Sequence, residues 1–533
     1  MKLTFWGADH EVTGSCHCIE VNGKRLLIDC GLAQGQDEKE DNQLPFSPAQ
    51  IDYVLVTHAH IDHSGRLPLL VKNGYHGPIY ATRATCELLG IMLRDSAHIQ
   101  EMDAQWKQRK RKRAGEEDVL PLYTALDVED TLPLLRPCSY GQEISVGPGI
   151  TAKFIDAGHL LGSASILLTL SENGAVKTVA FSGDIGNRHQ PIIRDPQYID
   201  KADYVLVEST YGNRLHGANA GSIQELAEIF DNTLRRGGNV VIPAFAVGRT
   251  QELLYHIRKI KEQNLVTSIP DFPVFVDSPL ALAATQIYDG DLTGYADEET
   301  LEVLRKGFRP IKFSNLNLCQ SADESIALNA DPTPKVIISS SGMCDAGRIR
   351  HHLKHNLWRS ECSVVFVGYQ ANGTLGRILV DGAQQIKLFG EQIAVKAEIY
   401  NFRGLSAHAD RDGLLDWVSH YKNKPEKIFV VHGEEEACES FTQLLNASGY
   451  HAVAPYYKAE YNLLTGRFET EGIPLWELQE RTAQKRKASP AYLRLVAMGE
   501  RIQEVIRHNE GGANKDLARF ADQLKSLIDK WDR

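Results

Sequence analysis

The densest group of side chains able to do chemistry lies at residues 57–65, which read Thr-His-Ala-His-Ile-Asp-His-Ser-Gly. Three histidines and one aspartate stand within six residues, directly after an apolar run typical of a buried strand. Imidazole nitrogens and carboxylate oxygens are good ligands for borderline cations such as zinc. A tight turn can direct His58 and His60 to one ion, and Asp62 and His63 to a neighbouring ion. The segment therefore predicts a metal site rather than a solvated histidine-rich loop.

Two later segments offer further ligands. His159 lies in Asp-Ala-Gly-His-Leu-Leu-Gly-Ser at residues 156–163, and Asp184 ends Phe-Ser-Gly-Asp at residues 181–184. A single histidine or aspartate after a strand is usually structural, but several such segments in one chain favour a shared cation site. A carboxylate can bridge two cations, which suits Asp184.

Apolar runs as long as a buried strand are expected to position these side chains. They lie at residues 25–29, 53–57, 179–182 and 204–208, and polar sequence containing glycine or histidine follows them. Side chains at strand ends are held by a rigid scaffold and still reach a shared cleft. We therefore expect the first two hundred residues to form one domain of short strands and tight turns.

The sequence changes in character after about residue 209. Strand–loop–helix units begin at residues 239, 274 and 336. Successive units of this kind are typical of a mostly parallel α/β domain. Their small-residue loops place backbone N–H groups at helix N-termini, which suits an anion such as phosphate, although every α/β domain contains such loops.

Strand-end histidines return at His408 and His432, which indicates that one domain is inserted into another. We expect residues 1–208 to form the first part of the first domain, 209–395 the inserted domain and 396–470 the completion of the first. The remaining residues, 471–533, have apolar side chains at helical spacing and predict a helical extension. This tail is expected to pack on the body or on a second subunit.

The ligand segments resemble the motifs of the metallo-β-lactamase superfamily. The resemblance rests on Ile-Asp-Cys-Gly at 28–31, His-Ala-His-Ile-Asp-His-Ser-Gly at 58–65, Ala-Gly-His-Leu-Leu-Gly-Ser at 157–163 and Ser-Gly-Asp-Ile-Gly at 182–186. It implies an αββα sandwich with two zinc ions per chain. By this resemblance one zinc ion is bound by His58, His60 and His159, and the other by Asp62 and His63. Asp184 would bridge the two ions, and Asp29 would orient the ligands.

The inserted region resembles the β-CASP nucleases, which implies an α/β β-CASP domain with a parallel sheet. Val-Glu-Ser-Thr-Tyr-Gly at 207–212 resembles their motif A, Leu-Ser-Ala-His-Ala-Asp at 405–410 motif B, and Val-His-Gly-Glu at 431–434 motif C. The likeness extends to about residue 467 and is greatest to prokaryotic relatives of the endonuclease subunit that processes pre-mRNA 3′ ends. A histidine in motif C resembles the branch that cuts RNA, whereas the DNA-repair branch has an aliphatic residue. His432 would complete the second zinc site.

The resemblance implies a zinc-dependent ribonuclease that cuts single-stranded RNA internally by means of a hydroxide activated by two zinc ions. His408 is the candidate general acid for the departing ribose oxygen, and Glu208 would orient it. Asp29 and Asp62 are counted with them among the catalytic residues. Loop chemistry and family likeness together suggest phosphate contacts from Ser340, Ser341, Gly342 and Arg377.

Three other functions remain open at this point. A 5′–3′ exoribonuclease of the ribonuclease J type would share the zinc chemistry. A small-molecule metallohydrolase, such as a thioesterase or lactonase, would share the first four motifs but would lack the insertion and the second pair of histidines. A noncatalytic partner in RNA processing is the third, and the complete set of ligands argues against it.

The net charge and the cysteines bear on what the protein binds and where it is located. The net charge of the 533 residues is -11, so any case for nucleic-acid binding must rest on local features. One such feature is the basic run at residues 107–113, which is either a track for RNA phosphates or a solvated helix face. Nine scattered cysteines, no secretory signal and no apolar run long enough to cross a bilayer favour reduced thiols and the cytoplasm. Single-stranded RNA and a second copy of the chain are the expected partners, with no membrane.

Overall fold

Two β-sheets face each other in the first domain. The computed structural model describes residues 1–34, 42–114, 119–216, 222–368, 370, 373–402, 406–474, 477 and 490–531. Within these residues the larger sheet has eight strands, ordered β23-β22-β1-β2-β3-β4-β5-β6, and the smaller has seven, ordered β21-β20-β11-β10-β9-β8-β7. The larger sheet comprises β1 (Lys2–Phe5), β2 (His17–Val21), β3 (Lys24–Ile28), β4 (Tyr53–Leu55), β5 (Ile79–Thr82), β6 (Leu135–Cys138), β22 (Glu460–Asn462) and β23 (Arg467–Thr470). The smaller comprises β7 (Glu143–Gly147), β8 (Ile150–Asp156), β9 (Ala164–Glu172), β10 (Ala175–Phe181), β11 (Tyr204–Glu208), β20 (Lys427–Val431) and β21 (Ala452–Val453).

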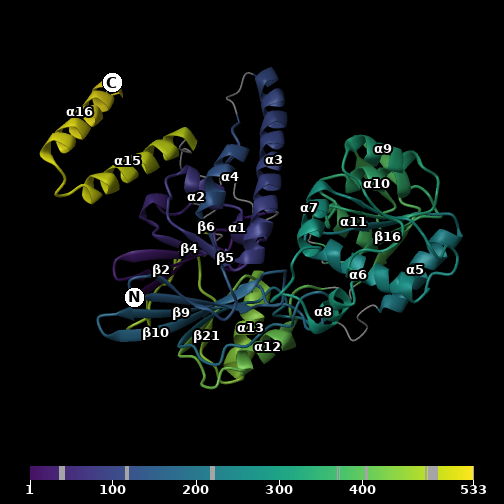
Figure 1. Ribbon diagram of the computed structural model, residues 1–533, viewed down its shortest axis with the longest axis horizontal. Helices are drawn as coiled ribbons and strands as arrows, with labels where there is room; N and C mark the ends of the chain where they lie inside the picture. The colour runs from purple at the N-terminus through teal and green to yellow at the C-terminus, as the bar shows by residue number, and fades with distance from the viewer. Residues whose placement is uncertain are drawn as a thin grey trace.

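Apolar side chains alternate along these strands and fill three layers. One buried cluster lies between the sheets and includes Phe5, Phe181 and Phe429. The other face of the larger sheet is covered by α1 (Ile61–Ser64), α2 (Leu67–Lys72), α3 (Arg83–Ala114) and α4 (Ala125–Thr131), and that of the smaller by α12 (Arg411–Ser419) and α13 (Glu435–Ala447). The first domain is therefore the expected αββα sandwich (Figure 1), because each sheet buries both of its faces.

The first domain is completed by segments far apart in the sequence. Strand β20 runs parallel to β11, with Glu208 opposite Val431, and β22 runs antiparallel to β1, with Leu3 opposite Tyr461. The chain therefore returns to both sheets after the inserted segment.

The inserted domain is built on a parallel sheet with the strand order β14-β13-β15-β12-β16-β19. Its strands are β12 (Val240–Pro243), β13 (Val274–Asp277), β14 (Leu316–Leu318), β15 (Val336–Ser339), β16 (Ser363–Phe366) and β19 (Glu398–Asn401). Around it lie α5 (Ile223–Arg235), α6 (Arg249–Glu262), α7 (Pro279–Tyr288), α8 (Glu298–Arg305), α9 (Ala322–Ala330), α10 (Ile349–Asn356), α11 (Leu375–Val380) and the hairpin of β17 (Gln385–Leu388) and β18 (Glu391–Ala394). Strand β19 pairs with β16, so this sheet extends past residue 395, where we expected the first domain to resume.

Two helices follow the sandwich, α15 (Pro490–His508) and α16 (Asn514–Trp531). They lie on the side of the first domain opposite the inserted domain (Figure 1), and a Cβ added at Gly74 would lie 3.3 Å from Cε of Met498. No side chain described on α16 is buried. Among the described residues, no helix is long and apolar enough to cross a bilayer.

Candidate metal centre

The expected ligands lie together at one end of the sandwich because they follow the carboxyl ends of strands from both sheets. His58 follows β4, His159 follows β8, Asp184 follows β10 and His432 follows β20. The close turn after β4 depends on Gly31, where a Cβ would lie 1.6 Å from the carbonyl oxygen of Asp62. The fold therefore converts positions scattered over most of the chain into one buried cluster.

Four of these residues form the first group. Nδ1 of His60 lies 3.1 Å from Nε2 of His58 and 3.2 Å from Nε2 of His159. Oδ2 of Asp184 lies 3.4 Å from Nε2 of His58 and 3.6 Å from Nε2 of His159. One ligand atom from each residue lies within 4.8 Å of the others, which is the spacing of a shared cation.

Asp62, His63 and His432 form the second group. Nε2 of His63 lies 3.0 Å from Nε2 of His432, and Oδ2 of Asp62 lies 3.8 Å from the latter atom. Oδ1 of Asp184 lies 3.2 Å from Nε2 of His63, so the two carboxylate oxygens of Asp184 face different groups. This placement suits a bridging ligand, the role expected of Asp184 from the sequence.

Hydrogen bonds fix the orientation of the imidazole rings. Nδ1 of His63 donates to Oδ2 of Asp29 at 2.7 Å, and Asp29 also accepts the backbone N–H and hydroxyl of Thr57 at 2.7 and 2.8 Å. The Thr57 hydroxyl lies 3.1 Å from Nδ1 of His58. With Nδ1 engaged in this way, Nε2 of each ring is left free to bind a cation.

The donor set fits a cation. Burial lowers the pKa of His58 and of His159 well below the usual range, so both rings are neutral and carry a lone pair. Burial raises the pKa of Asp184, but the charges of His432 and His63 outweigh this and hold the pKa well below its usual range. Neutral nitrogen lone pairs that converge at 3.1–3.2 Å around a carboxylate repel each other unless positive charge lies between them.

His408 and Glu208 lie beside the first group. Nδ1 of His408 is 3.2 Å from Oε1 of Glu208 and 4.0 Å from Oδ2 of Asp184. Glu208 is buried and also accepts the backbone N–H of Ile185 at 2.6 Å, while the His408 side chain is 22% exposed. Burial lowers the pKa of His408, but the Glu208 carboxylate, with Asp184 and Asp62, raises it to about 9. A cationic, partly exposed imidazole at this position can donate a proton.

A residue without any signal in the sequence links this pair to the metal ligands. Nε2 of Gln190 lies 2.9 Å from the carbonyl oxygen of Ala407 and 3.2 Å from that of Gly158. The Ala407 carbonyl also accepts the backbone N–H of Asn187 at 2.9 Å and lies 3.4 Å from Nδ1 of His159. Gln190 therefore ties the segment that carries His408 to the segment that carries His159.

The four expected phosphate contacts lie on two elements of the inserted domain. Ser340, Ser341 and Gly342 share the loop after β15, here called the serine loop and defined as residues 340–342. The Ser341 hydroxyl is buried and makes no hydrogen bond among the residues the structure describes. Arg377 lies on α11, where its guanidinium forms an ion pair with Asp381 at 2.8 Å.

The basic run at residues 107–113 lies on the last turns of α3. Lys107 and Arg109 are exposed, while the side chains of 110–113 lie outside the described residues. Gly404 and Leu405, in the segment that carries His408, also lie outside them.

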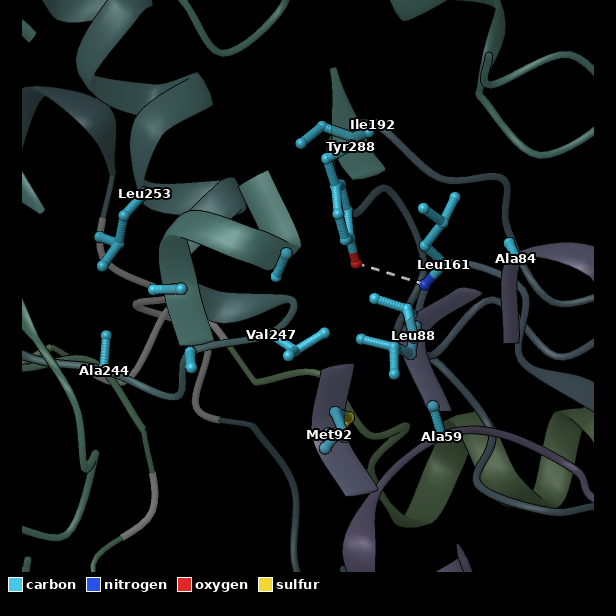
Figure 2. Close-up of a cluster of buried hydrophobic side chains, with 14 of the residues drawn as sticks. Ala59, Ala84, Leu88, Met92, Leu161, Ile192, Ala244, Val247, Leu253 and Tyr288 are labelled. Atoms are coloured by element: carbon cyan, nitrogen blue, oxygen red, sulfur yellow. Dashed lines mark hydrogen bonds between the residues drawn. The ribbon is translucent and has the colours of Figure 1, made fainter. Parts of the chain in front are cut away.

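A shared apolar cluster joins the two domains (Figure 2). It combines Leu88 and Met92 of α3 with Val247 and Leu253 of the inserted domain. The hydroxyl of Tyr288 accepts the backbone N–H of Leu161 at 3.4 Å across the boundary. The inserted domain is thus packed against the segment that follows the candidate ligand His159.

Family models match three stretches of the chain. Residues 11–244 match the metallo-beta-lactamase superfamily, and residues 250–379 match the Beta-Casp domain. Residues 392–455 match the Zn-dependent metallo-hydrolase RNA specificity domain.

Named relatives cover most of the chain. Ribonuclease TTHA0252 of Thermus thermophilus is 38% identical over 84% of this chain and 97% of its own length. Transcription termination factor FttA of Methanocaldococcus jannaschii is 31% identical over 83% of this chain and 68% of its own length. The RNase J-like protein of the same archaeon is 30% identical over 83% of this chain and 95% of its own length.

Proposed function

Because the chain belongs to the metallo-β-lactamase superfamily and carries its Beta-Casp domain, we propose that it is a metal-dependent ribonuclease that cuts single-stranded RNA internally with two zinc ions. The observation that carries the proposal is the His408–Glu208 pair, which stands 4.0 Å from the carboxylate shared by two groups of metal ligands. A hydrolase whose catalysis relied on its metal ions alone would not need an additional titratable pair at this position.

The two ligand groups would hold the metal ions. His58, His60 and His159 would bind one and Asp62, His63 and His432 the other, with Asp184 between them. When bound, the ions supply positive charge for the phosphate oxygens and acidify a water molecule. Asp29 keeps His63 in the tautomer whose Nε2 binds metal, because its carboxylate accepts the Nδ1 proton.

His408 would donate a proton to the ribose oxygen that leaves the phosphate. Glu208 engages Nδ1 and so leaves Nε2 as the donor. The carboxylate also stabilises the cationic ring, so that the proton is present when RNA enters the site. The serine loop would hold a flanking phosphate through the hydroxyl of Ser341, which has no hydrogen-bond partner among the described residues. Arg377 would join it only after its guanidinium releases Asp381.

The C-terminal helices would form a homodimer contact. The apolar residues of α16 recur at helical spacing, and no described side chain on this helix is buried. A second copy of the chain would cover this face. Light scattering on the full chain and on a chain ending at residue 509 tests the dimer, which the shorter chain should fail to form.

The nine cysteines are all free, which suits the reducing cytoplasm.

Cleavage of labelled RNA tests the enzymatic proposal. The zinc-loaded protein should cut internally labelled single-stranded RNA into oligonucleotides and leave DNA of the same sequence intact. His408→Ala should abolish cleavage while retaining metal, whereas the exposed His451→Ala should cut normally. Mononucleotides alone would assign a 5′–3′ exoribonuclease instead. No cleavage by the fully metal-loaded protein would overturn the ribonuclease.

A further inference from the structure

The loop between β12 and α6, residues 244–248, carries one large exposed side chain among buried ones. Ala244, Ala246 and Val247 are buried, whereas the ring of Phe245 is 48% exposed. Exposure of a phenylalanine costs free energy of folding, because its apolar surface stays in water. The exposed half of the ring is accessible to a ligand.

This loop contacts both the serine loop and the residue that follows the candidate ligand His159. A Cβ added at Gly342 would lie 3.4 Å from Cδ2 and Cε2 of Phe245, so the ring rests on the serine loop. At the other end, a Cβ added at Gly248 would lie 2.9 Å from Cδ1 of Leu160, the residue after His159. Phe245 therefore lies on the short stretch of backbone that connects the expected phosphate contacts to the expected ligands.

Hydrogen bonds hold the loop in place without the help of the ring. The carbonyl oxygen of Phe245 accepts the hydroxyl of Thr250 at 2.7 Å and its backbone N–H at 3.2 Å. The backbone N–H of Ala244 donates to Ser339 at 3.1 Å, and the carbonyl of Ala246 accepts Nε2 of Gln251 at 3.1 Å. Val247 anchors the loop in the cluster between the domains (Figure 2). The ring is thus presented by a preorganised backbone, which lowers the entropic cost of binding to it.

We propose that Phe245 is a stacking platform for one RNA base, positioned so that the neighbouring phosphate meets the serine loop. An aromatic face binds any nucleobase, because every base has a π-face, whereas the Ser341 hydroxyl would bind the phosphate. The inference rests on the proposed ribonuclease activity and adds the group that holds the nucleotide between the two domains. It makes the ring a determinant of RNA binding rather than of proton transfer.

Binding of fluorescent single-stranded RNA, followed by anisotropy, tests this role. All variants are made in the full-length, zinc-loaded His408→Ala protein, so that the RNA stays intact. Phe245→Ala and Phe245→Leu should each weaken binding about 5- to 150-fold, the equivalent of ~1–3 kcal/mol of stacking per base. Phe245→Trp should bind within about threefold of the unsubstituted protein, because it keeps an aromatic face.

Phe308→Ala is the matched control. Phe308 is 65% exposed in the same domain, but it lies on the segment that leads into the amino end of β14. The serine loop follows the carboxyl end of β15, at the other end of this parallel sheet. Substitution of Phe308 should leave the dissociation constant unchanged. Equal binding by Phe245→Ala, Phe245→Leu and Phe308→Ala would overturn the proposal.

RNAs that each lack one base identify the stacked nucleotide. The protein with Phe245 should lose affinity for one position of the missing base, and Phe245→Leu should show no further loss at that position. Identical position profiles for the two proteins would also overturn the proposal. Failure of the proposed function looks different, because the protein with both His408 and Phe245 would then neither bind nor cut RNA.

Discussion

Nδ1 of His408 lies 3.2 Å from Oε1 of Glu208, although 200 residues separate the two in the sequence. Glu208 ends a strand of the first domain before the insertion begins, and His408 follows the last strand of the inserted sheet. The pair therefore exists only when the inserted domain has folded and returned the chain to the metal centre.

Glu208→Gln should lower kcat by about 100-fold, because a neutral amide no longer stabilises the protonated ring of His408. The zinc content should stay the same, since Glu208 is not among the expected ligands. Steady-state cleavage of RNA and elemental analysis of the same sample measure both quantities. Glu228→Gln, on an exposed position of α5, is the matched control and should cut normally. An unchanged kcat for Glu208→Gln would remove Glu208 from the reaction.

His432→Ala should lower the zinc content by one ion per chain, because the second group would retain only Asp62 and His63 beside Asp184, the proposed bridge. Activity should fall to background, and the unfolding temperature should decrease because the cation stabilises only the folded state. Equilibrium dialysis with zinc and a thermal scan provide the readouts. If the variant still binds two ions per chain, His432 is not a ligand.

Gln190→Leu should lower kcat about 10- to 100-fold with little change in KM. The side chain of Gln190 holds the Ala407 carbonyl, and its loss frees the segment that carries His408. Single-turnover cleavage at saturating RNA isolates this effect. Gln384→Leu, an exposed glutamine on the inserted domain, should have no effect. A rise in KM alone would mean that Gln190 contributes to RNA binding and not to the position of His408.

The buried His17 should make the protein sensitive to acid. Burial, with the charges of His63 and His432, lowers the pKa of His17 to about 3. Below about pH 6.5, His17 is therefore protonated in the unfolded chain but stays neutral in the folded chain. The free energy of unfolding falls as the pH drops from 6.5 towards 3. One such proton contributes about 1.4 kcal/mol per pH unit.

His17→Leu removes this titrating group and should reduce the loss of stability as the pH falls. Unfolding temperatures of both proteins between pH 7 and pH 5 provide the comparison. Parallel curves would show that His17 takes no part in the acid response.

The candidate ligands could be located in the sequence because each one follows an apolar strand and carries a side chain able to bind cations. The αββα sandwich and the inserted parallel sheet follow from the same runs. Position at a strand end is a local property, so a single sequence reveals it at His58, His159 and Asp184.

Other features depend on contacts between distant segments, which a single sequence does not show. Gln190 lies in a loop and connects two segments by donating to the carbonyl oxygens of Gly158 and Ala407. Backbone carbonyls leave no side-chain signal in the sequence. The end of the inserted sheet at β19 depends on pairing with β16. The ion pair of Arg377 with Asp381 is different, because a spacing of four residues on a helix predicts it.

The pairing of β1 with β22 has a consequence for the order in which the protein is made. A ribosome synthesises the chain from its first residue, so the N-terminal strand waits for a neighbour that emerges more than 400 residues later. His408 and His432 also emerge late, after most of the ligands. His408, the proposed proton donor, is synthesised only after the last strand of the inserted sheet, so no nascent chain shorter than this carries the complete site.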